Sequence, residues 1–200
     1  MNPSWFGKCS DKLIKQLMIQ NMNPLAETKQ EYFSGFERLY LEDLEDGKIP
    51  SFFKLMDNLT SLVISKSNVG KVVKSSSFPE NIRSLAIGES GVTEFIFDDK
   101  GLSDLIMLNL SYNKLTSIPK NIAKLEILYD VVLKGNNIQG DIEIFAAGSK
   151  DVMWDLTSNP LTSVTWPENY FNRKVGVLID DSVLCHAVQD PENTDELLAH

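Results

Sequence analysis

The chain of 200 residues contains few of the residues that serve catalysis and metal binding, with only two histidines and two cysteines. Both histidines, His186 and His200, lie near the C-terminus, away from neighbours that would hold an imidazole in a Ser-His-Asp arrangement. The cysteines and histidines lack C-x-x-C and H-x-x-x-H spacings, and no glycine-rich phosphate-binding motif occurs. We therefore expect a protein that is not an enzyme and that has no cofactor and no metal site.

Positive charge and long apolar runs are also scarce. Lys and Arg together number 19 against 28 Asp and Glu, which gives a formal net charge of −9. This excess of acid argues against nucleic acid as a partner, because phosphate binding needs clustered positive charge. No run approaches the roughly 20 apolar residues that span a bilayer, and the N-terminus lacks the apolar core of a signal peptide. We expect no direct membrane insertion, and a cytoplasmic location on the sequence as given, or an extracellular one if the chain is a fragment of a receptor.

The sequence does contain a repeat of 23 residues. The segments 105–115 and 128–138 both fit the pattern L-x-x-L-x-L-x-x-N-x-L, and they are 23 residues apart. Steps of 23 residues in both directions find the pattern again, and one further unit fits at a spacing of 22. A constant period over this many units indicates a stack of repeats rather than chance clustering of apolar residues. The units, about eight in number, start near residues 14, 36, 59, 82, 105, 128, 151 and 174.

The L-x-L core of each unit alternates apolar and outward positions, which predicts a short strand with one buried face. One strand per unit, always with the same polarity, gives a parallel sheet. The second half of each unit must return the chain through a turn and a short helical or extended stretch. Stacked units then form a curved solenoid around one continuous core. We expect an N-terminal cap or flank over 1–13, the repeat domain over 14–185 and an acidic C-terminal tail over 186–200.

The second half of the unit repeats as well, because the segments 115–128 and 49–59 share the tail I-P-x-x-I-x-x-L with apolar residues at the same positions. The sequence thus resembles the 23-residue leucine-rich repeats of Ras-binding scaffold proteins and of receptor-type kinases. The segment 139–142 is similar to the G-x-I-P tail of plant-type receptor repeats. The resemblance implies an α/β repeat fold, a leucine-rich repeat solenoid shaped as a curved right-handed horseshoe with a parallel β-sheet on its concave face.

The resemblance also implies a structural role for the asparagine at the ninth position of the unit. Its side-chain amide is expected to satisfy backbone groups in the turn after each strand. Asn113, Asn136 and Asn159 occupy this position in three consecutive units. Ser67 and Ser90 occupy it in two earlier units, where a hydroxyl reaches less far.

The two cysteines lie at opposite ends of the predicted solenoid, Cys9 before the first unit and Cys185 after the last strand. Strands in a sheet are about 4.7–4.9 Å apart, so eight units separate the ends by roughly 30 Å or more. A disulfide requires Cα atoms within about 7 Å, so we expect no bond between these two residues. Either both are free thiols, as in a reducing compartment, or each has lost a partner from the caps of an extracellular domain.

Without catalytic chemistry, the outward positions of the predicted sheet are the candidate binding surface. Small side chains near its middle allow another chain to approach closely, and acidic side chains lie at both ends. Exposed tyrosine and methionine are typical anchors of protein interfaces. The predicted partner-binding residues of the concave face are Tyr40, Glu42, Val63, Ser65, Met107, Asn109, Tyr112, Val132, Lys134, Met153, Asp155 and Thr157.

We therefore predict a protein-protein interaction module, a scaffold in signal transduction, that binds a protein or peptide partner on its concave sheet. The acidic ends favour a partner with basic residues. An alternative is that the chain is the ligand-sensing segment of a larger receptor-type kinase or other signalling enzyme. A purely structural spacer is a third interpretation, which the exposed aromatic and methionine side chains disfavour. The sequence predicts no particular oligomeric state.

Overall fold

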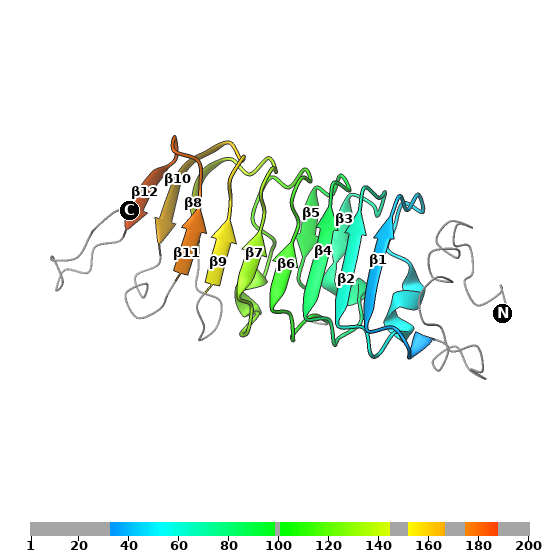
Figure 1. Cartoon of the computed structure of the whole chain (residues 1–200). Helices are drawn as coiled ribbons and strands as arrows, with labels where there is room; N and C mark the ends of the chain where they lie inside the picture. Colours follow the sequence, from blue (N-terminus) through cyan, green and yellow to red (C-terminus); the bar gives the residue numbers. More distant parts are fainter. Residues whose placement is uncertain (1–32, 99–100, 145–151, 167–174, 188–200) are drawn as a thin grey trace.

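The computed structural model describes residues 33–98, 101–144, 152–166 and 175–187. Its main element is one parallel sheet of seven strands that lie side by side along the molecule (Figure 1). In spatial order the strands are β1 (Arg38–Glu42), β2 (Ser61–Ser65), β4 (Ser84–Gly88), β6 (Met107–Asn109), β7 (Asp130–Val132), β9 (Val152–Asp155) and β11 (Val175–Leu178).

Every pairing in this sheet has a register of 23 residues. Leu39 pairs with Leu62, Leu62 pairs with Leu85, and Leu85 pairs with Leu108. The same offset joins β6 to β7, β7 to β9 and β9 to β11. One strand per 23-residue unit, always parallel to the last, confirms the expected repeat solenoid.

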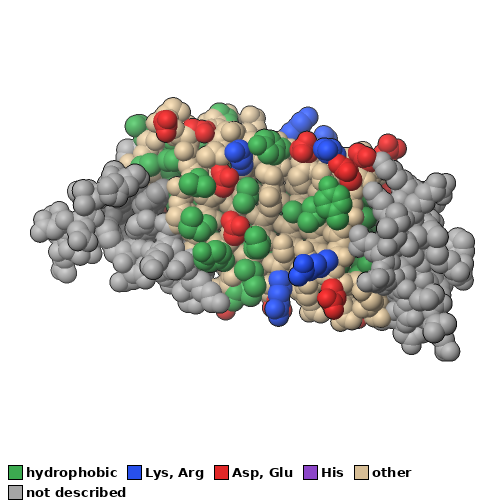
Figure 2. All heavy atoms as spheres, viewed as in Figure 1, with side chains coloured by type: hydrophobic (Ala, Val, Ile, Leu, Met, Phe, Trp, Pro, Cys, Tyr) green, Lys and Arg blue, Asp and Glu red, His purple; other side chains and the backbone are tan. Residues whose placement is uncertain are grey.

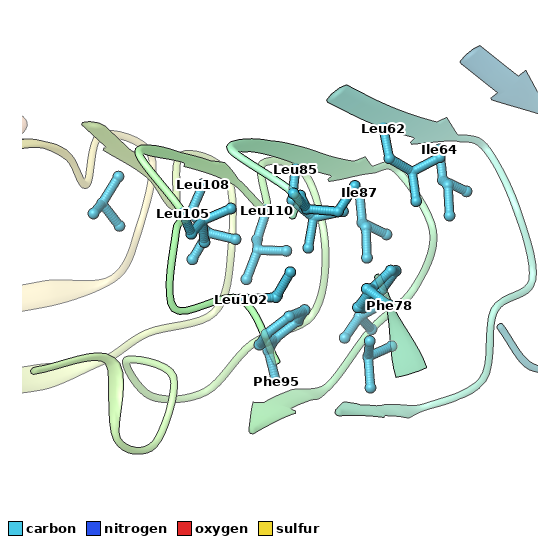
Figure 3. Packing of buried hydrophobic residues seen from close by; sticks show 14 of the residues in the cluster. Leu62, Ile64, Phe78, Leu85, Ile87, Phe95, Leu102, Leu105, Leu108 and Leu110 are labelled. Carbon is cyan, nitrogen blue, oxygen red and sulfur yellow. The ribbon is translucent and has the colours of Figure 1, made fainter. Parts of the chain in front are cut away.

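The core forms from the apolar positions that alternate along these strands. Leu108 on β6 is buried, while Met107 and Asn109 on either side of it face outward. Figure 3 shows buried leucines and isoleucines from successive units pointing toward Phe78 and Phe95, whose stacked rings have centroids 6.4 Å apart on the opposite side of the solenoid. A fully buried leucine contributes about 1.5–3 kcal/mol relative to an exposed one, so each unit stabilises its neighbours through this shared core.

The opposite side of the solenoid is built from short extended segments and 3-10 turns. A two-stranded parallel sheet of β3 (Val72–Lys74) and β5 (Glu94–Ile96) lies behind β2 and β4 (Figure 1). A three-stranded parallel sheet has the order β12 (Leu184–Ala187), β10 (Leu161–Trp166) and β8 (Gly140–Glu143). In the described ranges, this side also contains three 3-10 helices, η2 (Ser51–Leu55), η3 (Ser75–Ser77) and η4 (Ile122–Lys124).

The helical half of the expected α/β horseshoe is therefore not seen in the described repeat units, where 3-10 turns take its place. A 23-residue unit leaves little chain for an α-helix after its strand and turn. Pro50, Pro79 and Pro119 lie in this half of three units, and a proline disfavours the helical region for the residue before it. The expected N-terminal cap over 1–13, the unit starting near 14, Cys9 and most of the acidic tail lie outside the described residues.

The turn after β7 is held by the side chain of Asn136. Its Nδ2 donates to the carbonyl of Leu133 in the same unit at 2.8 Å and to the carbonyl of Leu110 in the preceding unit at 2.9 Å. Its Oδ1 accepts the backbone N–H of Leu115 at 3.0 Å. The asparagines one unit before and one unit after make the equivalent bonds, so three buried amides form a ladder through consecutive turns.

Serine makes a more local version of this contact in the earlier units. The Ser90 hydroxyl donates to the carbonyl of Gly88 at 2.7 Å and accepts the backbone N–H of Ser67 at 3.2 Å. The Ser67 hydroxyl makes the same pair of bonds one unit earlier. The hydroxyl is a single short donor, and it donates to a carbonyl of its own unit rather than to one in the unit before it.

Asp98 fastens two neighbouring turns on the opposite side of the solenoid. Its Oδ1 accepts the Ser75 hydroxyl at 2.7 Å and the Ser76 backbone N–H at 2.9 Å, and its Oδ2 accepts the Ser76 hydroxyl. Desolvation alone would raise the pKa of the Asp98 carboxyl, but the hydrogen bonds from Ser76 and Ser75 outweigh it and hold the pKa below its ordinary value.

Replacing Asp98 with Asn is expected to lower the free energy of unfolding at pH 7 by about 1 kcal/mol, because charge-assisted hydrogen bonds are weakened. The carboxylate contribution is complete above the unfolded-state pKa of about 3.9 and is lost as the pH falls through the lower folded-state pKa. Urea unfolding across this range should therefore show a difference between parent and variant that disappears in acid. Asp104→Asn, at an exposed carboxylate, is the control. A difference that persists unchanged in strong acid contradicts the assignment.

Candidate functional site

The outward side of the seven-stranded sheet, called here the front face, carries its side chains in rows that cross the strands. One row contains Met107 on β6, Asp130 on β7 and Met153 on β9, which are paired in register. The next row contains Asn109, Val132, Asp155 and Leu178. Figure 2 shows hydrophobic side chains gathered around acidic ones over this part of the sheet.

The row of Met107, Asp130 and Met153 places a carboxylate between two thioethers. Met107 is 47% exposed and Met153 is 38% exposed, so both side chains are available to a partner. Desolvation and the nearby Asp155 carboxylate both raise the pKa of Asp130. The carboxylate of Asp130 makes no hydrogen bond or ion pair with any described residue, whereas that of Asp155 accepts the hydroxyl of Thr157 at 2.7 Å. The Asp130 carboxylate is therefore partly desolvated, and no described cation pairs with its charge.

Met153 owes its position to a glycine on the next strand. Gly176 on β11 is paired with Met153, and a Cβ at Gly176 would overlap the Met153 sulfur. The thioether thus lies over the backbone of β11. Methionine side chains adapt to irregular partner surfaces because they are unbranched and polarizable. Leu178, which is 55% exposed and paired with Asp155, extends the apolar surface at this end.

Tyr112, in the turn after β6, is held by the backbone of the following unit. It is 53% exposed, yet a Cβ at Gly135 would lie 2.6 Å from its Cδ1 atom. The ring therefore packs directly on the Gly135 α-carbon, and the φ of +66° at Gly135 is one that glycine adopts without strain. A tyrosine held in this way loses little side-chain entropy on binding.

Gly135→Ala should lower the free energy of unfolding by about 1 kcal/mol more than Gly140→Ala does. Both positions have positive φ and incur the same kind of backbone strain, but no atom lies within 4 Å of a Cβ at Gly140. The added cost at Gly135 comes from displacing the Tyr112 ring. Chemical denaturation of the two variants measures the difference. Equal destabilisation would show that the ring does not rest on Gly135.

The other end of the front face is separate from the methionine region. Tyr40 on β1 is exposed, and Glu42 forms an ion pair with Lys66 at 2.9 Å. Between the two ends the outward side chains are small, among them Ser65 beside Gly88. Of the twelve predicted partner-binding residues, nine lie on strands of this sheet and three lie in the turns that follow strands. The nine are Tyr40, Glu42, Val63, Ser65, Met107, Asn109, Val132, Met153 and Asp155, and the three are Tyr112, Lys134 and Thr157.

The predicted set omitted Asp130 and Leu178, which the rows place against predicted residues. Asp130 could have been found by adding 23 to Met107, because the constant register puts both in one row. Leu178 follows from Asp155 in the same way. Asp130 lies between Met107 and Met153, and Leu178 lies beside Asp155, so these side chains form one continuous surface.

Within the described residues, no group of three His, Cys, Asp or Glu side chains is arranged to hold a metal ion. Cys185 on β12 is an exposed free thiol. Across the ranges that the structure describes, none of the helices has the length and apolar character to cross a bilayer.

Comparison with known proteins finds a relative with a similar repeat sequence. Fibromodulin of Sus scrofa, a leucine-rich repeat protein, is 33% identical over 95 residues. The aligned stretch covers 46% of this chain and 63% of the relative, so it spans less than two thirds of that protein. No protein-family model matches the chain.

Proposed function

We propose that this chain, whose repeat pattern and parallel sheet resemble those of leucine-rich repeat proteins, is a non-enzymatic interaction module that binds a protein or peptide partner on its front face. The supporting observation is the row in which exposed Met107 and Met153 flank the uncompensated Asp130. Soluble surfaces usually solvate such a carboxylate or pair it with a cation. A partner that supplies both apolar contact and positive charge satisfies this row.

The partner we propose carries basic residues among apolar ones. Asp130 and Asp155 lie on adjacent strands, and no described Lys or Arg forms an ion pair with either. A net charge of −9 adds a long-range attraction that increases the association rate at low salt. The rigid sheet holds the anchors in place before binding, which reduces the entropy lost in the complex.

The proposal extends to the location and the wider role of the chain. We propose that the front face is the concave side of a curved horseshoe and that the module acts in signalling. Of the two locations expected from the sequence, similarity to Fibromodulin favours the extracellular one. In the alternative, the chain is the ligand-sensing segment of a larger receptor-type kinase or other signalling enzyme, and the front face binds the ligand.

Affinity capture from the native source tests this function. The parent chain is compared with a front-face variant, in which Tyr40, Met107 and Met153 are changed to Ala. The matched control changes Val72, Lys74 and Thr162 to Ala on the opposite side of the solenoid. All three must first show the same circular dichroism. We expect parent and control to capture the same partner, and the front-face variant to bind it at least tenfold more weakly. Equal binding by all three would place the site elsewhere.

A further inference from the structure

The side of the solenoid opposite the front face has an interruption between its two small sheets. The first sheet extends beyond β5 through a parallel bridge from Ile96 to Lys120. The second sheet begins one unit later with β8, which is an edge strand because, among the described residues, it pairs with β10 alone. Between them lies a groove of about 430 Å³, lined by the segments 116–121 and 138–143.

The backbone of β8 presents to this groove hydrogen-bonding groups that no residue in the described ranges pairs with. The N–H of Gly140 donates to Pro160 at 3.4 Å, and the N–H of Ile144 donates to Thr165 at 3.0 Å, so these residues face β10. Successive backbone groups along a strand point to opposite edges. The N–H and C=O groups of Asp141 and Glu143 therefore point away from β10, toward the groove.

The opposite wall is already paired on its other side. The carbonyl of Lys120 accepts the N–H of Phe97 at 3.1 Å, which ties this segment to the first sheet. The groove thus separates the two small parallel sheets, and the second of them has its edge strand, β8, at the groove. Exposed strand edges are the sites where extended peptides add to sheets in many complexes.

Side chains along β8 define what such a peptide would carry. Asp141 and Glu143 are exposed on the outer side of the strand, and Ile142 packs against the core. Ile118, on the other wall, also packs against the core. Lys120 is already paired with Glu94, so it does not neutralise the carboxylates of β8. An added strand gains most when basic residues alternate with apolar ones, because cross-strand pairs are then complementary on both sides.

We propose that this groove is a second interaction site, where an extended segment of a partner protein with alternating basic and apolar residues adds to the free edge of β8. The main-chain groups of Asp141 and Glu143 provide the pairing, and their carboxylates select the basic positions. The site is independent of the front face, so either can be present without the other.

A capped octapeptide of alternating lysine and valine is the probe, and its binding to the full chain is measured by fluorescence anisotropy. Two further peptides have the same side chains but carry N-methyl groups on alternate residues. One of them lacks the N–H groups along one edge of the extended peptide, and the other lacks those along the opposite edge. We expect at least a tenfold loss for the version that blocks the edge facing β8, because it removes the pairing groups without changing charge. Equal binding of all peptides, or no binding of the parent peptide, overturns the proposal.

Two protein variants separate the backbone contribution from the charge. Glu143→Gln removes the carboxylate and keeps the N–H, whereas Glu143→Pro removes both. Because this N–H points away from β10, proline at this edge position spares the β8–β10 pairing. We expect the proline variant to bind the octapeptide at least tenfold more weakly than the glutamine variant. Equal affinities of these two variants would contradict strand addition, and the N-methyl peptides decide the question if the proline variant does not fold.

Discussion

Replacement of Asn136 with Ala lowers the free energy of unfolding by about 3–5 kcal/mol. The substitution removes the hydrogen bonds donated to Leu110 and Leu133 and the bond accepted from Leu115 in a buried turn. The N–H of Leu115 is then unsatisfied, which costs about 1–3 kcal/mol, and each lost donated bond adds about 0.5–1.5 kcal/mol. The two carbonyls keep the bonds that they accept from Asn113 and Asn159. Since the amide joins two units, the loss weakens their interface as well as one turn.

The neighbouring asparagine provides a matched control for this measurement. Asn137 is exposed and its backbone N–H donates to the carbonyl of Leu115 at 2.8 Å, but its side chain bonds to no described residue. Asn137→Ala should therefore change the free energy of unfolding by less than about 0.5 kcal/mol. Urea denaturation followed by circular dichroism gives both values. Similar stabilities of the two variants would show that the asparagine ladder does not hold the turns.

Reversal of charge at Asp130 and Asp155 together, by substitution with Lys, reduces affinity for the captured partner about 100-fold. Like charges brought together in an interface cost several kcal/mol, and about 2.7 kcal/mol corresponds to this factor. The pKa of Asp130 is raised by desolvation and by Asp155, so acidification neutralises it at a higher pH than an ordinary aspartate. As the pH is lowered, the parent chain should accordingly begin to lose affinity before an ordinary aspartate would be protonated.

The control for this charge reversal makes the same change away from the front face. Glu80 and Glu126 are exposed and lie off the strands of the sheet, so changing both to Lys alters net charge equally. We expect the control to reduce affinity only a few-fold, mainly through a slower association rate at low salt. Titration calorimetry compares the two. Equal losses would mean that the partner responds to net charge rather than to this pair.

The period of the sequence predicted the front of the solenoid well, because it determines both strand position and register. Once Leu85 and Leu108 are aligned, the pairing of Met107 with Asp130 follows from the same offset. The burial of Leu108 between two outward residues follows from alternation alone. These features depend on a pattern repeated in every unit, so each unit supports the assignment of the next.

The opposite side could not be predicted in this detail because its residues vary from unit to unit. Val72–Lys74 and Gly140–Glu143 both form strands, yet they share no side-chain pattern. The pairing of segments there depends on the local path of the chain after each front-face strand. Pro119 and the bulge between Leu161 and Ser163 are two features that alter this path. For the same reason the open edge of β8 became evident only from the hydrogen bonds of its neighbours.

Methionine methyl resonances give the most direct test of whether the front face binds the partner. Met107 and Met153 are exposed on this face, and Met56 is fully buried, so one labelled sample contains both the probes and an internal reference. Addition of the captured partner should shift or broaden the ε-methyl signals of Met107 and Met153 and leave that of Met56 unchanged. A saturated complex in which the Met107 and Met153 signals keep their free positions would contradict binding on the front face.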